Sequence, residues 1–167
     1  MMKEATFFKV IGANGQIGKF LVQQLTHEGK HQVTAMVRKP EQADALKQLG
    51  ANVVIGDLEG SVEDLAEAMK DHNAIVFTAG SGGSTGADKT LLIDLDGAVK
   101  TMEAAQQQGI TRYILVRTDL KSGSIPREDV ARVIAASLQE EKTYRMAFDL
   151  IAGDDLVEDA LEYGMAD

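Results

Sequence analysis

Hydrophobic residues follow two spacings along this chain. Short, nearly continuous apolar runs predict buried strands, and longer segments with apolar residues at helical spacing predict amphipathic helices. The predicted strands are residues 6–11, 31–37, 52–55, 74–78, 112–116 and 145–151. The predicted helices are residues 16–28, 40–49, 61–70, 87–108, 126–140 and 155–163. Because strands and helices alternate with short connections, we predict an α/β fold: a Rossmann-like, doubly wound parallel sheet with a layer of helices on each face.

The periodicity also predicts which helical residues face the sheet. In helix 16–28 these residues are Ile17, Phe20, Leu21 and Leu25. In helix 87–108 they are Leu91, Leu92, Leu95, Val99 and Met102. Ser61 and Asp64 resemble a capping box at the start of helix 61–70. The length of 167 residues suits a single domain, residues 1–167, with its own core.

Composition narrows the function classes. The formal net charge of −9 disfavours a nucleic-acid partner, and the absence of cysteine excludes disulfides and thiol catalysis. No apolar run approaches the roughly 20 residues that span a bilayer, and no signal-peptide core is present, so we expect no membrane contact and a cytoplasmic protein. His27, His31 and His72 lack metal-ligand spacing, and we expect them at the surface, with no metal site.

Three glycines, Gly12, Gly15 and Gly18, follow the first predicted strand with the spacing G-x-x-G-x-x-G. Gly12 permits a sharp turn, Gly15 lets backbone N–H groups approach a pyrophosphate, and Gly18 lets the next helix pack closely on the strand. Free N–H groups and the helix dipole favour an anion at this point. We therefore predict a dinucleotide site. The alternative is an ordinary glycine turn between a strand and a helix.

The end of the second predicted strand indicates the kind of cofactor. NAD-binding folds usually place an acidic residue there, whereas this chain has Arg38 and Lys39. A guanidinium binds a 2′-phosphate through two charge-assisted contacts, and Lys39 supplies a second cation. The pair favours NADP over NAD. The alternative is a pair of solvated surface charges at a helix start.

Two further segments follow predicted strands and belong to the same edge of the sheet. Asp57 and Leu58 stand where an Asp side chain and the next backbone amide can bracket an adenine ring; the alternative is an acidic turn before a helix. Small residues end strand 74–78 and indicate a backbone that lines a ligand: Thr78, Ala79 and Gly80. Residues 81–86 are either a flap that orders on binding or a flexible connection.

With these motifs placed, the chain resembles the short-chain dehydrogenase/reductase superfamily. Within it, the chain is similar to the atypical branch of NmrA-like proteins, biliverdin reductase B-type flavin reductases and the NAD-dependent epimerase/dehydratase family. The resemblance is carried over residues 7–116 by VIGANGQIGKFLV, AMVRKP, FTAGSGGSTGADKT and LIDLDGAVKTMEAA. It resumes over residues 117–163 in SGSIPREDVARVIAASL and AFDLIAGD. It implies a seven-stranded sheet with NADP across its carboxyl edge.

Matching positions imply a role for each candidate residue. The residues implied to line the pyrophosphate are Gly12, Asn14, Gly15, Gln16 and Ile17. The resemblance assigns the 2′-phosphate to Arg38 and the adenine to Asp57 and Leu58. It assigns the nicotinamide ribose to Thr78, Ala79 and Gly80.

The chain departs from this family after the fifth predicted strand. Family members carry roughly 40 to 50 further residues there, which supply a Ser or Thr, often a Tyr-x-x-x-Lys pair, and a sixth strand. Here a polar loop, residues 117–125, follows directly, and none of Tyr113, Tyr144 and Tyr163 starts such a pair. Either the sequence joins two pieces of a longer chain between about residues 116 and 118, or the protein is truly shortened. The first is favoured because a deletion would leave buried sheet edges unpaired. In either case no catalytic residue can be named.

The resemblance implies an NADP-dependent oxidoreductase that transfers hydride from NADPH to a small quinone, flavin or carbonyl compound. Flavin-reductase-like members work without the tyrosine pair. A second hypothesis is a non-catalytic NADP-binding redox sensor, which needs a protein partner and an exposed apolar patch. A third is a sugar-nucleotide epimerase or dehydratase, which needs bound NAD⁺ and a tyrosine base; Arg38 argues against the first requirement. The fold alone does not choose among them.

Overall fold

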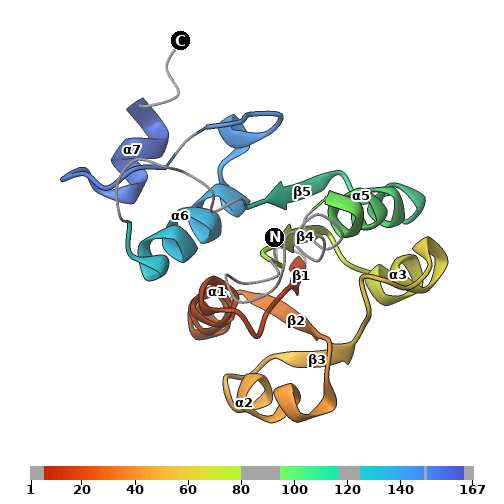
Figure 1. The fold of residues 1–167 in the computed structure, drawn as a ribbon. Helices are drawn as coiled ribbons and strands as arrows, with labels where there is room; N and C mark the ends of the chain where they lie inside the picture. Colours follow the sequence, from red (N-terminus) through yellow and green to blue (C-terminus); the bar gives the residue numbers. More distant parts are fainter. Residues whose placement is uncertain (1–5, 80–94, 117–124, 149, 164–167) are drawn as a thin grey trace.

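A five-stranded, all-parallel sheet organises the protein (Figure 1). The computed structural model describes residues 6–79, 95–116, 125–148 and 150–163. The strands are β1 (Thr6–Ile11), β2 (His31–Val37), β3 (Asn52–Ile55), β4 (Ala74–Phe77) and β5 (Arg112–Leu115). Their spatial order is β3-β2-β1-β4-β5, so the chain winds outward from β1 in one direction and then returns to wind in the other. This reversal creates a switch point between β1 and β4, where doubly wound folds bind ligands.

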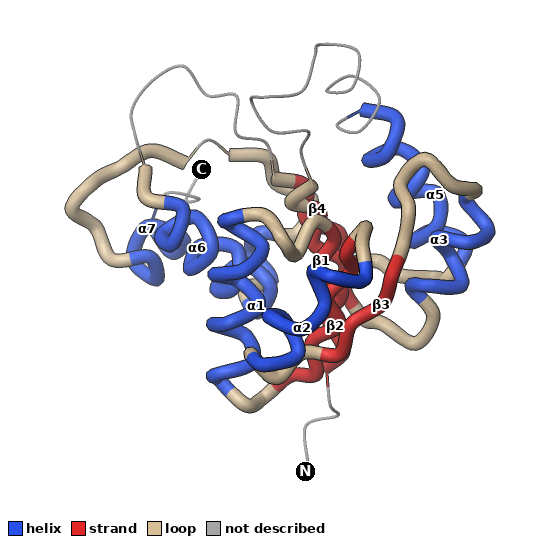
Figure 2. The backbone as a smooth tube through the Cα atoms, turned by 60° about the horizontal axis from the view of Figure 1, so that its bottom comes forward, coloured by secondary structure: helices blue, strands red, loops and turns tan. Residues whose placement is uncertain are grey.

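Helices cover both faces of the sheet. They are α1 (Gln16–Glu28), α2 (Ala43–Gln48), α3 (Val62–Met69), α5 (Ala98–Gln107), α6 (Arg127–Gln139) and α7 (Val157–Tyr163). Two short 3₁₀ helices, η1 (Pro40–Gln42) and η3 (Glu141–Thr143), complete the described elements. Figure 2 shows the strands between a layer with α1 and α6 and a layer with α3 and α5. The prediction of a Rossmann-like, three-layer α/β fold is therefore confirmed.

Each face of the sheet has its own hydrophobic core. Successive strand residues point to opposite faces, so Val10 belongs to the core under α1 and α6 while Ile11 belongs to the core under α3 and α5. Both side chains are almost wholly buried, as expected for a central parallel strand covered on both sides. This double coverage explains why β4 is a continuous apolar run and β1 a nearly continuous one.

The sequence pattern predicts several elements with the bounds that the structure gives them. These are β1, β2, β3 and α1. The N-cap half of the predicted capping box is confirmed, because Ser61 Oγ accepts a hydrogen bond of 3.1 Å from the Asp64 backbone N–H at the start of α3. The Asp64 carboxylate accepts from the Ser61 hydroxyl at 2.8 Å. Local signals suffice at these places because each apolar run ends at a glycine, a charge or a capping residue.

The predicted strand over residues 145–151 is wrong. Its described residues form no strand; the 3₁₀ helix η3 precedes them, and Arg145 adopts a left-handed backbone with φ of 61°. The alternating apolar residues there are largely exposed: Met146, Phe148 and Ile151. A strand needs a neighbour to pair with, and the described sheet ends at β5. The family resemblance implies seven strands, whereas the described residues form a sheet of five.

The predicted inner face of α5 is also wrong. Leu95, Val99 and Met102 are exposed, and the buried face consists of the small residues Ala98, Thr101, Ala104 and Ala105. Small side chains let α5 approach the sheet and α3 closely, and this close approach leaves the larger apolar residues outside. Phe20 of α1 is likewise 38% exposed. The predicted positions Leu91 and Leu92 lie outside the described residues.

A buried arginine joins the sheet to the C-terminal part of the chain. Arg112 of β5 donates hydrogen bonds to the Ser137 carbonyl in α6, to the Thr143 carbonyl and to the Thr143 hydroxyl. Its guanidinium also lies 4.0 Å from the centre of the Tyr144 ring. Five N–H donors in a fixed plane allow one side chain to hold several acceptors in this way.

Lys9 is an unusual residue in the centre of the sheet. It lies on β1, is 1% exposed, and donates a hydrogen bond to the Ala68 carbonyl of α3. Burial lowers the pKa of Lys9 to about 8. The pKa of His72, in the turn after α3, is also lowered. The larger cause is burial, and the second is the positive charge of Lys9.

Lys9→Met is expected to stabilise the protein at neutral pH by about 1 to 3 kcal/mol, because the charged amine is removed from an apolar site. The folded-state pKa of Lys9 lies below its unfolded value, so the unfolded state binds more protons between about pH 8 and pH 10.5. The wild-type protein should therefore gain stability over this range, and the advantage of the variant should shrink. Urea unfolding at neutral and alkaline pH measures the difference; a variant less stable at neutral pH would contradict the prediction.

Candidate functional site

The predicted glycine turn follows β1 directly and lies against the end of β4. Gly12 has a φ of 77°, and a Cβ on it would lie 2.5 Å from the Ala79 backbone nitrogen. Thr78 Oγ1 donates hydrogen bonds to the carbonyls of Ile11 at 2.8 Å and Gly12 at 3.3 Å. Only glycine fits at position 12, so this residue brings the ends of β1 and β4 together.

Gly18 and Gly15 have different roles in the same turn. A Cβ on Gly18 would lie 2.5 Å from the Gly12 carbonyl oxygen, so this glycine allows α1 to pack on the turn. A Cβ on Gly15 meets only that oxygen within 4 Å, at 3.3 Å. Gly15 is exposed at the N-cap of α1. The structure thus separates a packing glycine from one that leaves room for a ligand.

The N-terminus of α1 has the features of an anion site. No side chain caps the helix, and its first turn contains no acidic residue. Uncapped helix N–H groups and the positive end of the helix dipole attract a negative group. Gln16 is exposed beside Gly15, Asn14 is partly exposed, and the Ile17 side chain is buried in the core. Ile17 could therefore reach a pyrophosphate only through its backbone.

Backbone hydrogen bonds continue along the carboxyl edge of the sheet from β1 to β3. The Ala13 N–H donates to the Met36 carbonyl at 3.4 Å, and the Gly56 N–H donates to the Val37 carbonyl at 2.9 Å. The segments after β1, β2, β3 and β4 therefore meet at one edge. This edge brings together the described candidate residues from all four segments; Gly80 and residues 81–86 lie outside the described residues.

Arg38 and Lys39 follow β2 at this edge, and both are exposed. Arg38 Nη2 lies 3.7 Å from Oε2 of Glu59, in the segment that follows β3. This contact is longer than a bidentate ion pair, so the guanidinium remains able to bind another anion. Lys39 is the N-cap of the 3₁₀ helix η1, and its N–H donates to the Gln42 side chain at 3.1 Å.

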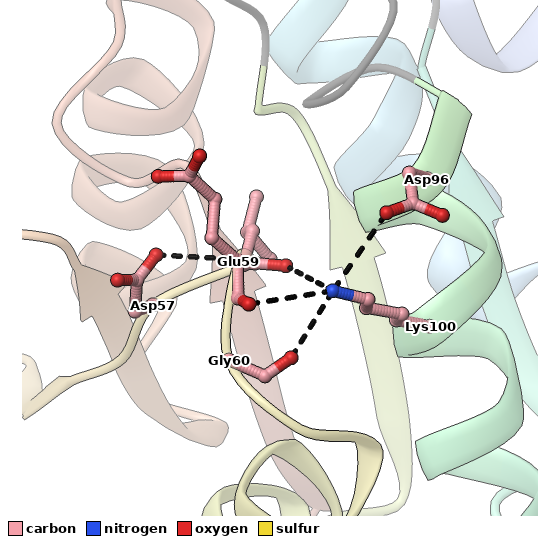
Figure 3. A network of polar contacts seen from close by, with 6 residues as sticks. Asp57, Glu59, Gly60, Asp96 and Lys100 are labelled. Carbon is pink, nitrogen blue, oxygen red and sulfur yellow. Dashed lines mark hydrogen bonds and ion pairs between the residues drawn. The ribbon is translucent and has the colours of Figure 1, made fainter.

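The segment after β3 is held in place by Lys100 of α5 (Figure 3). Lys100 Nζ donates to the Gly60 carbonyl at 3.1 Å and to the carbonyls of Leu58 and Glu59 at 3.4 Å each. It also lies 3.7 Å from an Asp96 carboxylate oxygen, one helical turn earlier. One ammonium group thus fixes three successive carbonyls next to the predicted adenine contacts.

Two further contacts shape this segment. The Asp57 side chain accepts a hydrogen bond of 2.9 Å from the Glu59 N–H, and Asp57 is otherwise exposed. Leu58 packs against Gly97 at the start of α5, where an added Cβ would lie 3.4 Å from the leucine side chain. Sequence reasoning missed both Lys100 and Glu59; the only available signals were the helical spacing of Asp96 and Lys100 and the proximity of Glu59 to Asp57.

Lys100→Met is expected to weaken NADPH and NADH binding by a similar factor, about threefold to tenfold, because the segment predicted to contact the adenine loses its anchor while the predicted 2′-phosphate contacts remain. Fluorescence titration with both coenzymes measures this. Lys70→Met is a matched control, because the Lys70 side chain lies at the surface and its ion pair with Glu67, at 4.0 Å, is exposed. A loss confined to one coenzyme would contradict the prediction.

Neither tyrosine with a described side chain is poised as a catalytic base. Tyr113 lies under α5 with its hydroxyl 2.7 Å from Thr101 Oγ1, and burial raises the pKa of Tyr113 to about 12. Tyr144 covers the Arg112 guanidinium. A tyrosine with a raised pKa donates and accepts protons poorly at neutral pH. Tyr113 is therefore unsuited to act as a base at neutral pH.

The histidine prediction is only partly correct. His27 is exposed, whereas His31 stacks on Phe8 with ring centres 4.6 Å apart and His72 is partly buried. Within the described ranges, no group of three or more His, Cys, Asp or Glu residues could hold a metal ion. Nor does any described helix combine the length and apolar character that crossing a membrane requires.

Comparison with known proteins decides the family. Residues 12–119 match the profile of a family described as NAD(P)H-binding. The chain belongs to this family. The match covers the glycine turn, Arg38, the segment after β3 and the end of β4, and the prediction of an atypical short-chain dehydrogenase/reductase-like protein is confirmed. The family description does not distinguish NADP from NAD.

Individual relatives agree with the family. The uncharacterized sugar epimerase YhfK of Bacillus subtilis is 39% identical over 208 aligned positions, which cover 92% of this chain and 97% of the relative. An NAD-dependent epimerase/dehydratase structure from Bacillus halodurans has a TM-score of 0.85 at 30% identity, covering 95% of this chain and 99% of that one. Triphenylmethane reductase from Citrobacter sp. has a TM-score of 0.54 at 27% identity, covering 77% of this chain and 44% of that one.

The alignment with the Bacillus subtilis relative also shows a difference in length. Its 208 positions exceed the 167 residues of this chain, so the relative has residues with no counterpart here. The relative is longer than this chain, as the family resemblance implies for members with further residues after the fifth predicted strand.

Proposed function

We propose that this protein is an NADP-dependent oxidoreductase that transfers hydride from NADPH to a small quinone, flavin or carbonyl compound. The observation that carries the proposal is the position of Arg38, exposed at the carboxyl edge beside an uncapped helix N-terminus. NADPH supplies the hydride when it is bound, and the chain binds it, orients it and excludes water. Triphenylmethane reductase supports a reductase because it shares the fold at 27% identity.

Each part of the edge has a role in this proposal. The turn Gly12–Gly15 and the first N–H groups of α1 bind the pyrophosphate, with Asn14, Gln16 and the Ile17 backbone alongside. Arg38 and Lys39 bind the 2′-phosphate, Asp57 and Leu58 bracket the adenine, and Thr78, Ala79 and Gly80 face the nicotinamide ribose. We also propose that residues 1–167 form one domain, and that the relative's extra residues fall between about residues 116 and 118.

A comparison of the two coenzymes tests the proposal. We expect NADPH to bind more tightly than NADH in a fluorescence titration, and NADPH to be oxidised in the presence of at least one quinone or flavin. Circular dichroism confirms that the sample is folded. A folded protein that binds neither coenzyme would overturn the proposal.

A non-catalytic NADP sensor is the second candidate. Its support is an exposed apolar stripe formed by Leu95, just before α5, and by Val99 and Met102 of α5, which suits contact with a protein partner. Tight NADPH binding without oxidation by any acceptor would favour it. A sugar-nucleotide epimerase or dehydratase is a third candidate, supported by two similar proteins that are named a sugar epimerase and an NAD-dependent epimerase/dehydratase. It would require tight NAD⁺ binding and a tyrosine base.

A further inference from the structure

The contact between Arg38 and Glu59 bears on coenzyme selectivity. Arg38 is the cation proposed to bind the 2′-phosphate, and its Nη2 lies 3.7 Å from Oε2 of Glu59. Both side chains are about half exposed, at 53% and 49%. An anion that binds Arg38 therefore arrives next to a carboxylate that already shares the guanidinium.

Glu59 is held in this position through its backbone. Its N–H donates to the Asp57 side chain, and its carbonyl accepts from Lys100 Nζ (Figure 3). The neighbouring Gly60 is fixed by the same ammonium and by a 3.0 Å hydrogen bond from its N–H to the Asp57 carbonyl. With its backbone fixed, Glu59 can move away from Arg38 only by rotating its side chain.

The two coenzymes differ only at the group that would meet this pair. NADP carries a 2′-phosphate, whose negative charge is attracted by Arg38 and repelled by the carboxylate. NAD carries a hydroxyl, which is neutral and can donate a hydrogen bond to a carboxylate. The Glu59 carboxylate is therefore expected to weaken the binding of NADP and to leave the binding of NAD unchanged or slightly stronger.

We propose that Glu59 is a specificity-determining residue that opposes Arg38 and lowers the preference of this site for NADP over NAD. The inference rests on the proposed function, because it places the 2′-phosphate at Arg38.

Glu59→Gln tests the proposal, because it removes the charge and keeps the size of the side chain. We expect the NADPH dissociation constant to fall by about threefold to tenfold and the NADH dissociation constant to stay the same or rise. The gain should shrink at high ionic strength, which screens exposed charges. Glu67→Gln is the matched control: it makes the same change of net charge at an exposed glutamate of α3, which lies 4.0 Å from Lys70.

A double variant shows whether the effect passes through Arg38. In an Arg38→Ala background, Glu59→Gln should give a smaller NADPH gain, because the carboxylate no longer competes for the guanidinium. The inference is overturned if Glu59→Gln and Glu67→Gln change NADPH binding equally, or if Glu59→Gln weakens it. If the wild-type protein prefers NADPH in an Arg38-dependent manner, these results overturn only the role of Glu59. If the folded wild type binds neither coenzyme, the proposed function fails and this inference fails with it.

Discussion

Gly15→Val is expected to weaken binding of NADPH and NADH alike by at least about 100-fold, while the fold is retained. The backbone at Gly15, with φ of −68° and ψ of 167°, suits any residue. A Cβ there meets only the Gly12 carbonyl oxygen, at 3.3 Å. The valine methyl groups would fill the open space at the N-terminus of α1, where the pyrophosphate is proposed to bind. Calorimetric titration with both coenzymes, together with thermal unfolding, measures the two parts of this prediction.

Two other glycines provide the comparison. Gly153→Val makes the same substitution at an exposed position, where an added Cβ would meet no other part of the protein within 4 Å. It should change neither coenzyme binding nor stability. Gly18→Val should instead lower the unfolding temperature, because its Cβ would lie 2.5 Å from the Gly12 carbonyl oxygen and 2.7 Å from the Ala13 Cα. If Gly15→Val binds both coenzymes normally, the glycine turn has another role.

Arg38→Ala is expected to weaken NADPH binding by about 10- to 100-fold and NADH binding by less than about threefold. The physical reason is the loss of a charge-assisted contact to a group that only NADPH carries. Fluorescence titration of the variant with each coenzyme gives the ratio directly. Equal losses for the two coenzymes would contradict the assignment of the 2′-phosphate to this residue.

Arg132→Ala is the control for this change. Arg132 lies on α6 and is 53% exposed, the same as Arg38, and it contacts Glu128 at 3.0 Å and Asp129 at 3.1 Å. Removal of this guanidinium alters the net charge equally but leaves the carboxyl edge untouched. The selectivity ratio of this variant should therefore match that of the wild-type protein.

Most of the fold follows from local patterns in the sequence. The ends of β1 and β2 were predictable because apolar runs stop at Gly12 and at Arg38. Since the carboxyl ends of parallel strands share one edge, the same pattern predicts that the candidate residues lie close together. The geometry of the Gly12 turn against Ala79 agrees with that expectation.

Other features depend on contacts between distant segments, which periodicity does not encode. Lys100 is 40 residues from Gly60 in the sequence, and only the folded structure brings it to the segment after β3. The prediction of the buried face of α5 was wrong because small residues form its packing surface. A hydrophobicity pattern instead favours the larger side chains Leu95 and Val99 as the buried ones. The predicted strand at residues 145–151 failed because pairing needs a partner.

The hydrogen bonds of Arg112 make the end of α6 and the helix η3 inseparable from the sheet. Truncation of the chain before Ser137 would leave a guanidinium on β5 without the acceptors in α6 and η3 that it now uses. A buried charge without acceptors is strongly destabilising, so the truncated protein would lose stability well beyond the helices removed. Shortened versions made for expression or crystal growth should therefore keep this region intact.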